Sequence, residues 1–83
     1  MRIDKFLKIS RLIKRRSIAK EACEKERVII NGRTAKAGSV VKAGDVIELR
    51  IGNGSLSVKV LKLSESSRKE DAETMYEIIN GSG

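Results

Sequence analysis

The sequence predicts a small single domain of the α+β class, with two N-terminal helices and a C-terminal helix packed on a small antiparallel β-sheet. The chain has 83 residues, of which 40% are hydrophobic, so one modest core is expected. Apolar residues recur with helical spacing at both ends of the chain and alternate with polar residues in the middle. Glycine-containing turn sequences separate the alternating stretches, as in an antiparallel sheet.

The spacing of apolar residues predicts both N-terminal helices. The first helix is marked at i, i+3 and i+4 by Ile3, Phe6 and Leu7. It is expected to end near Ser10, and Ser17 is a suitable N-cap for a second helix that continues to about Lys25. The buried face of the second helix is expected to comprise Ile18, Ala19, Ala22 and Cys23. Cys23 therefore reads as a small buried hydrophobe rather than a reactive thiol.

The middle of the chain has the two-residue period of β-strands. Val28-Ile29-Ile30 is β-branched and runs into Asn31-Gly32, a type I′ hairpin signal. Ala43-Gly44-Asp45 and Gly52-Asn53-Gly54 are further turns. Between and after them, two strands are marked by alternating apolar residues: Ile47, Leu49 and Ile51, then Leu56, Val58 and Val60. These two strands should pair as an antiparallel hairpin, with the helices packed against them.

A polar connector precedes the predicted C-terminal helix. Ser67 and Glu70 have the spacing of a capping box. The helix that follows is marked at i, i+3, i+4 and i+7 by Ala72, Met75, Tyr76 and Ile79. Asn80-Gly81 is expected to close it.

The net charge of +7 is concentrated at one end of the chain. Residues 1–20 hold eight Lys and Arg against Asp4 alone, whereas residues 21–83 hold ten basic and ten acidic residues. The basic residues interleave with apolar ones, so folding should fix them in space. A solvated, solubilising face is the plain alternative, but such a face is usually built from charges of both signs. The cluster indicates a polyanionic partner, either nucleic acid or an anionic membrane.

Several kinds of chemistry lack the residues they need. The chain has no histidine and one cysteine, so no general base pairs with a nucleophile and no Cys/His set holds zinc. We expect no enzyme, no metal and no cofactor. The longest apolar run, Val28-Ile29-Ile30, is too short for a membrane span, so a soluble cytoplasmic protein is expected. Phe6 and Tyr76 are the only aromatic residues, and both lie on apolar helical faces, so phosphate contacts should replace base stacking.

An ordered set of motifs resembles the S-four RNA-binding domain. Its pieces are Arg2-Ile3-Asp4-Lys5-Phe6-Leu7, Arg11, Arg16-Ser17-Ile18-Ala19, Val28-Ile29-Ile30-Asn31-Gly32 and Gly44-Asp45. The whole chain is similar to the RqcP-type ribosome quality-control factors of bacteria. The resemblance implies an αL-type fold over residues 1–64, with a connector and helix over 65–83 packed on the same domain. It also implies a monomer that binds rRNA and peptidyl-tRNA on obstructed large ribosomal subunits. There it would assist an RqcH-type factor that adds alanine tails.

The resemblance places phosphate contacts at Arg2 and Arg16. Other basic residues of the same block are expected beside them: Arg11, Lys14, Arg15 and Lys20. Helical spacing agrees, because Arg16 and Lys20 are one turn apart. For Lys5 and Lys8, RNA contact and plain solvation both stay open.

Three positions depart from the usual domain pattern. Glu26 stands where a glycine normally ends the second helix, so either Glu26 adopts a left-handed conformation or the helix exits differently. Ala43 replaces a common proline, and the turn at Gly44-Asp45 is expected to stay intact. Arg15 takes the place of a common threonine and adds charge.

Three other functions remain as alternatives. A heat-shock-type factor that recycles stalled large subunits has the same domain, but such relatives look longer. A helix-turn-helix DNA-binding regulator would need a third helix, for which Asn31-Gly32 leaves little room. Binding to a membrane surface would need the apolar residues of the first helix, which the core requires.

Overall fold

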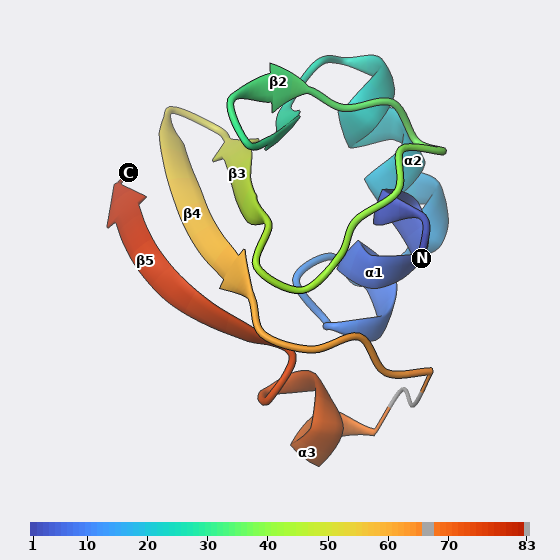
Figure 1. Cartoon of the computed structure of the whole chain (residues 1–83). Helices are drawn as coiled ribbons and strands as arrows, with labels where there is room; N and C mark the ends of the chain where they lie inside the picture. The colour runs from blue at the N-terminus through green and yellow to red at the C-terminus, as the bar shows by residue number, and fades with distance from the viewer. Residues whose placement is uncertain (66–67, 83) are drawn as a thin grey trace.

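The structure is a computed structural model that describes residues 1–65 and 68–82. Its elements in chain order are α1 (Ile3–Ile9), α2 (Arg16–Glu24), β1 (Val28–Ile30), β2 (Arg33–Thr34), β3 (Val46–Ile51), β4 (Gly54–Val60), α3 (Lys69–Ala72) and β5 (Tyr76–Ser82). The strands form one antiparallel sheet in the order β2-β1-β3-β4-β5 (Figure 1). The predicted α+β class is confirmed.

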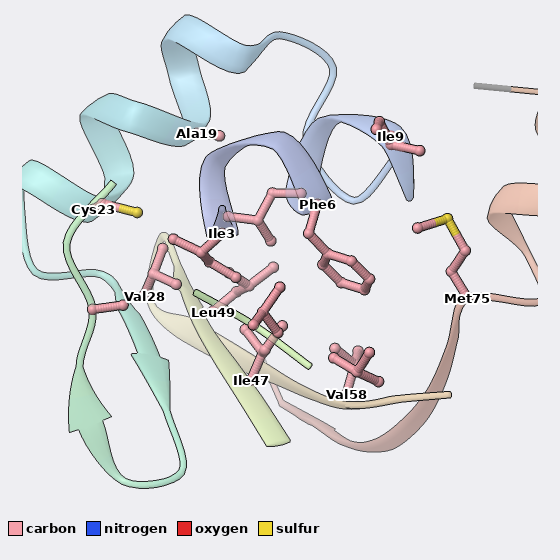
Figure 2. Packing of buried hydrophobic residues seen from close by; sticks show 14 residues of the cluster. Ile3, Phe6, Ile9, Ala19, Cys23, Val28, Ile47, Leu49, Val58 and Met75 are labelled. Carbon is pink, nitrogen blue, oxygen red and sulfur yellow. The ribbon is translucent and has the colours of Figure 1, made fainter. Parts of the chain in front are cut away.

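The core lies between α1, α2 and one face of the sheet. Ile3, Phe6 and Leu7 are each 0% exposed, which confirms the predicted face of the first helix. Figure 2 shows Ile3 and Phe6 pointing from α1 toward the strand residues Ile47, Leu49 and Val58, with Met75 entering from the side. Cys23 is buried on α2, as expected, and burial raises the pKa of its thiol. The core therefore fixes both helices, and with them the basic block, to the sheet.

Helix α2 begins earlier than the sequence predicted. Arg15, not Ser17, is the N-cap: it is extended, and its carbonyl accepts hydrogen bonds from the amides of Ile18 (3.1 Å) and Ala19 (3.0 Å). The prediction of Ser17 as cap was wrong, because no side-chain cap forms and Ser17 sits inside the first turn. Helix α2 contacts α1, and such tertiary packing outweighs the capping preference of a single serine, which is worth about 1 kcal/mol.

Two isoleucines predicted to be buried are exposed. Ile18 on α2 is 49% exposed and Ile51, at the end of β3, is 58% exposed. Both residues fit the apolar spacing of their helix or strand, but the neighbouring elements do not extend far enough to cover their side chains. Periodicity identifies the face of a helix or strand, but it does not say how far the neighbouring layer extends.

The β1–β2 hairpin has the predicted turn. Asn31 and Gly32 have φ values of 51° and 82°, as a type I′ turn requires. The Asn31 side chain donates to Asp45 Oδ1 (3.0 Å) and accepts from the amide of Val46 (2.9 Å), which ties this turn to the start of β3. The second turn is intact despite Ala43, with Gly44 at φ 95°.

The C-terminal helix, predicted to run from the Ser67 cap to Asn80-Gly81, is confirmed in its first turn and wrong beyond it. Helix α3 ends at Ala72, and Tyr76–Ser82 forms β5, which pairs with β4 through Val60↔Tyr76 and Val58↔Ile78. Tyr76 therefore lies on a strand and not on a helix. The window is rich in aromatic and β-branched residues, and pairing along β4 satisfies backbone groups that a short helix would leave exposed. The predicted capping serine, Ser67, lies outside the described residues.

Of the two conformations predicted for the end of α2, the structure has the one in which the backbone of Glu26 is left-handed. Glu26 has φ 60°, and its amide donates to the carbonyl of Cys23 (3.0 Å). The amide of Arg27 donates to the carbonyl of Ala22 (2.9 Å). These two bonds form a Schellman motif with glutamate in the position that usually holds glycine.

Among the described residues, no helix is long and apolar enough to span a membrane.

Candidate RNA-binding surface

The basic residues of the first quarter of the chain lie on α1, on α2 and on the loop that joins them. Arg2 precedes α1, while Lys5 and Lys8 lie within it. Lys14 and Arg15 lie in the loop and are exposed, and Arg16 and Lys20 lie exposed on α2. The two helices contact each other, as the N-terminal part of Figure 1 shows. The fold thus gathers a block that is contiguous in sequence onto one layer of the molecule.

Asp4 connects the two arginines that the resemblance singled out. Its Oδ2 accepts from Arg2 Nη2 (3.2 Å), its Oδ1 lies 3.4 Å from Arg16 Nη2, and the same Oδ1 accepts from the Lys5 amide (2.8 Å). The Asp4 side chain is 4% exposed, whereas those of Arg2 and Arg16 are 53% and 49% exposed. A buried carboxylate therefore holds one edge of each guanidinium, and about half of each arginine side chain remains open to solvent.

Arg2 is also fixed from the side of the sheet. The backbone around it pairs with the loop before β3: the Ile3 amide donates to the Ser39 carbonyl (2.7 Å), and the Val41 amide donates to the Met1 carbonyl (2.8 Å). Gly38 lies beside the guanidinium, since a Cβ at that position would be 3.9 Å from Arg2 Nη2. The main chain at Arg2 is consequently held by a loop that is distant in sequence.

A second group of cations forms around the end of α1. Arg11 follows the helix in the left-handed region, with φ 64°, and its amide donates to the Lys8 carbonyl (3.1 Å). Lys8, Arg11 and Lys14 line one shallow hollow together with Ile13. A left-handed conformation at a non-glycine residue costs roughly 1–2 kcal/mol, and here it turns the chain so that three cations converge.

The remaining predicted residues differ in their surroundings. Lys5 forms an ion pair with Glu65, in the connector toward α3. Across residues 1–65 and 68–82, the side chains of Arg15 and Lys20 form no ion pair. The structure thus brings Arg2 together with Arg16 and Lys8 with Arg11 and Lys14, while Arg15 and Lys20 stand apart.

Asp4 has no role predicted from the sequence, yet in the structure it joins the two arginines of the surface. One signal was present: Asp4 is the only acid among the first 20 residues. The contribution of the loop around Gly38 had no local signal, because it arises from pairing between segments more than 30 residues apart.

In the part of the chain that is described, no group of three or more His, Cys, Asp or Glu residues is placed to hold a metal ion.

Comparison with known proteins agrees with this geometry. The sequence pattern of the S4 domain, the S-four domain named above, matches residues 1–47, which contain every basic residue of the surface. The chain belongs to the S4 domain family. A relative from Halalkalibacterium halodurans, named RQC P-site tRNA stabilizing factor, is 54% identical over 94% of this chain and 89% of its own length.

Heat shock protein 15 proteins are more distant relatives within the same family. A homologue from Haemophilus influenzae is 36% identical over 93% of this chain but only 60% of its own length. The solved structure of heat shock protein 15 from Vibrio cholerae, described as trimeric, superposes with a TM-score of 0.87 at 32% identity and covers 95% of this S4 chain and 81% of that one. This chain therefore shares its fold with heat shock protein 15, and its sequence identity is higher with the tRNA-stabilizing relative.

Proposed function

We propose that this S4 domain protein is a non-catalytic RNA-binding factor of ribosome quality control. It binds rRNA and peptidyl-tRNA on large ribosomal subunits that are obstructed by a nascent chain. By holding the tRNA, it assists an RqcH-type factor in adding C-terminal alanine tails. In this proposal the protein works in the cytoplasm as a monomer. Residues 1–64 form its RNA-binding domain, and residues 65–83 pack on the same domain.

The observation that carries the proposal is the pair of half-exposed arginines held by buried Asp4. Each guanidinium keeps donors free for phosphate oxygens while its position is fixed by the protein. Relatives named for stabilizing a P-site tRNA match nearly the whole chain at more than 50% identity, which supports tRNA as one ligand.

The mode of binding follows from the residues that are available. Phe6 is 0% exposed and Tyr76 lies on β5, so neither aromatic residue stacks on RNA bases from this surface. Contacts to phosphate and sugar remain, and these read the shape of a folded RNA rather than its sequence. Such binding releases counterions, so affinity for the subunit should fall steeply with salt.

A second candidate is a heat-shock-type factor that recycles stalled large subunits. The close superposition on heat shock protein 15 favours it. Sequence identity favours the first proposal, because this chain is 54% identical to the tRNA-stabilizing relative and 36% identical to the heat-shock one. A DNA-binding regulator is less well supported, since β1 follows α2 directly and, within residues 1–65 and 68–82, no third helix is placed to enter a groove. Competition between labelled rRNA and duplex DNA separates that class: preference for the duplex would contradict RNA binding.

Co-sedimentation with large subunits that carry peptidyl-tRNA tests the proposal. Arg16→Ala should weaken binding about tenfold or more, because one oriented phosphate contact is lost. Lys59→Ala is the matched control, since it removes the same charge. Lys59 lies between Val58 and Val60, which are buried against the core, so its side chain points to the opposite face of the sheet. Equal losses for the two variants, or no binding by the wild type at physiological salt, would contradict the proposal.

Deletion in cells separates the two ribosomal candidates. Loss of the protein should abolish alanine tailing of stalled chains if it assists an RqcH-type factor. Unchanged tailing together with accumulation of obstructed subunits would favour the recycling function instead.

A further inference from the structure

A second surface lies on the flank of α2 that faces away from Arg2 and Arg16. Successive residues of a helix are rotated by about 100°, so Ile18 and Arg16 point about 160° apart. Ile18 on α2 and Ile51 at the end of β3 are 49% and 58% exposed, and both border one hollow. Three partly buried apolar residues continue its lining: Leu12, Ile13 and Ala22. The hollow, here called the α2–β3 groove, thus has apolar residues from α2, from the loop before it and from the end of β3.

The walls of the α2–β3 groove are held by main-chain hydrogen bonds. The left-handed turn at Glu26 carries the chain from α2 to Arg27, whose carbonyl accepts from the Arg50 amide (2.9 Å). The Arg27 amide in turn donates to the carbonyl of Ala22 (2.9 Å). The exit of the helix is therefore fastened to the end of β3. The groove exists before any ligand arrives, which lowers the entropy cost of binding.

The edge of the groove has three basic residues, Lys25, Arg27 and Arg50, and one acid, Glu21. Acids pair with two of these cations, so Arg27 carries the local excess of positive charge. Lys25 pairs with Glu21 (2.7 Å) and Arg50 with Glu48 (3.2 Å), whereas Arg27 forms no ion pair within residues 1–65 and 68–82. The positive side chains border an apolar floor, so a complementary ligand has an apolar stripe flanked by acids.

Aliphatic character favours a peptide over RNA as the ligand. No aromatic residue of the described chain lines the groove, so it offers no platform for base stacking. Branched aliphatic side chains at the floor suit Leu, Ile or Met residues from one face of a helix. We propose that the α2–β3 groove binds an acidic amphipathic helix of a partner protein. This inference goes beyond RNA binding and does not depend on it: one flank of α2 faces RNA, and the other holds a protein.

A designed peptide of about 18 residues tests the proposal, with leucines at i, i+3, i+4 and i+7 and glutamates on its other faces. The full-length protein is titrated with it while its isoleucine methyl resonances are followed by NMR. Saturable shifts should appear at Ile18 and Ile51 and be absent at the buried Ile3 and Ile47 of the core. A peptide with lysine in place of each glutamate should bind at least about tenfold more weakly.

Ile18→Ser combined with Ile51→Ser should weaken peptide binding about tenfold or more, since both side chains form the floor. Ile78→Ser on β5 is the control: it removes the same side chain from a site that is 60% exposed, and binding should stay within about twofold. All these sites are exposed, so the variants should fold, and circular dichroism verifies it independently of the groove and of RNA binding.

Any of four results would overturn the proposal. The first is no saturable shift at the groove, and the second is an equal loss of peptide binding for the two variants. The third is a stronger shift of the same methyls by a short RNA. The fourth is self-association that the double variant abolishes, because the groove would then belong to a second copy of this chain. Failure of subunit binding with intact peptide binding would count against the proposed function alone.

Discussion

Arg16 and Lys20 lie one turn apart on α2, carry the same charge, and differ in what holds them. Arg16 shares the buried Asp4 carboxylate with Arg2. Lys20 and Arg15, the N-cap residue of the same helix, are exposed and form no ion pair in the described part of the chain. The surface therefore has an anchored pair, Arg2 and Arg16, and an unanchored pair, Arg15 and Lys20.

The comparison separates charge from position. Both pairs attract a polyanion at distances within the Debye length, so both raise the rate at which the protein encounters RNA. An unanchored side chain must lose rotamer freedom when it binds, at a cost of about 0.5–1.5 kcal/mol, and the anchored arginines have already lost part of theirs. The anchored pair should therefore contribute more to affinity, although the two pairs contribute equally to net charge.

The largest expected effect compares two double variants that lower the net charge equally. Arg2→Ala with Arg16→Ala should weaken binding to large subunits on the order of 100-fold, because two oriented, charged hydrogen-bond donors are lost. Arg15→Ala with Lys20→Ala should weaken it by about tenfold or less. Binding is measured by co-sedimentation at several salt concentrations, and circular dichroism confirms that both variants are folded. Equal losses would mean that charge alone matters and that anchoring does not.

A smaller effect is expected from exchanging arginine and lysine while the charge is kept. Arg16→Lys should weaken subunit binding a few-fold, roughly three- to fivefold, because an ammonium cannot pair with Asp4 and a phosphate through one planar group. Lys20→Arg should leave affinity within about twofold. The salt dependence should be the same for both variants. If the Arg16→Lys variant binds like the wild type, the planar geometry of the guanidinium does not contribute to affinity.

The smallest expected effect lies outside the RNA-binding surface. Glu26→Gly should raise the free energy of unfolding by about 0.5–1 kcal/mol, because glycine adopts φ 60° without the steric cost that glutamate has. Urea denaturation measures it, and subunit binding should not change. A loss of stability would show that the glutamate side chain offsets its backbone strain.

The sequence was sufficient for the elements whose local pattern agrees with the tertiary structure. The apolar spacing of Ile3, Phe6 and Leu7 and the turn at Asn31-Gly32 need no distant partner, and both were predicted correctly. The C-terminal segment was not: Ala72, Met75, Tyr76 and Ile79 have helical spacing, but the free edge of β4 pairs with the chain from Tyr76 onward and selects a strand there. Ile18 and Ile51 were misjudged because the extent of the neighbouring layer is a tertiary property.

The composition of the candidate surface followed from the sequence, but its organisation did not. The concentration of charge in residues 1–20 identified the basic residues. Pairing of Arg2 and Arg16 through Asp4 requires α1 and α2 to meet at one place, which spacing within a single helix does not predict. The contact of Lys5 with Glu65 likewise joins segments that only the fold brings together.

Asp4→Asn tests most directly whether the buried carboxylate orients the two arginines for RNA. The substitution keeps the shape of the side chain and removes a negative charge, so the net charge rises above +7. Long-range attraction alone would then strengthen binding to large subunits. The account predicts instead that binding weakens about tenfold in a protein whose circular dichroism shows it to be folded, and that adding Arg16→Ala costs less than it does in the wild type. A folded Asp4→Asn protein that binds as tightly as the wild type, or more tightly, would contradict it.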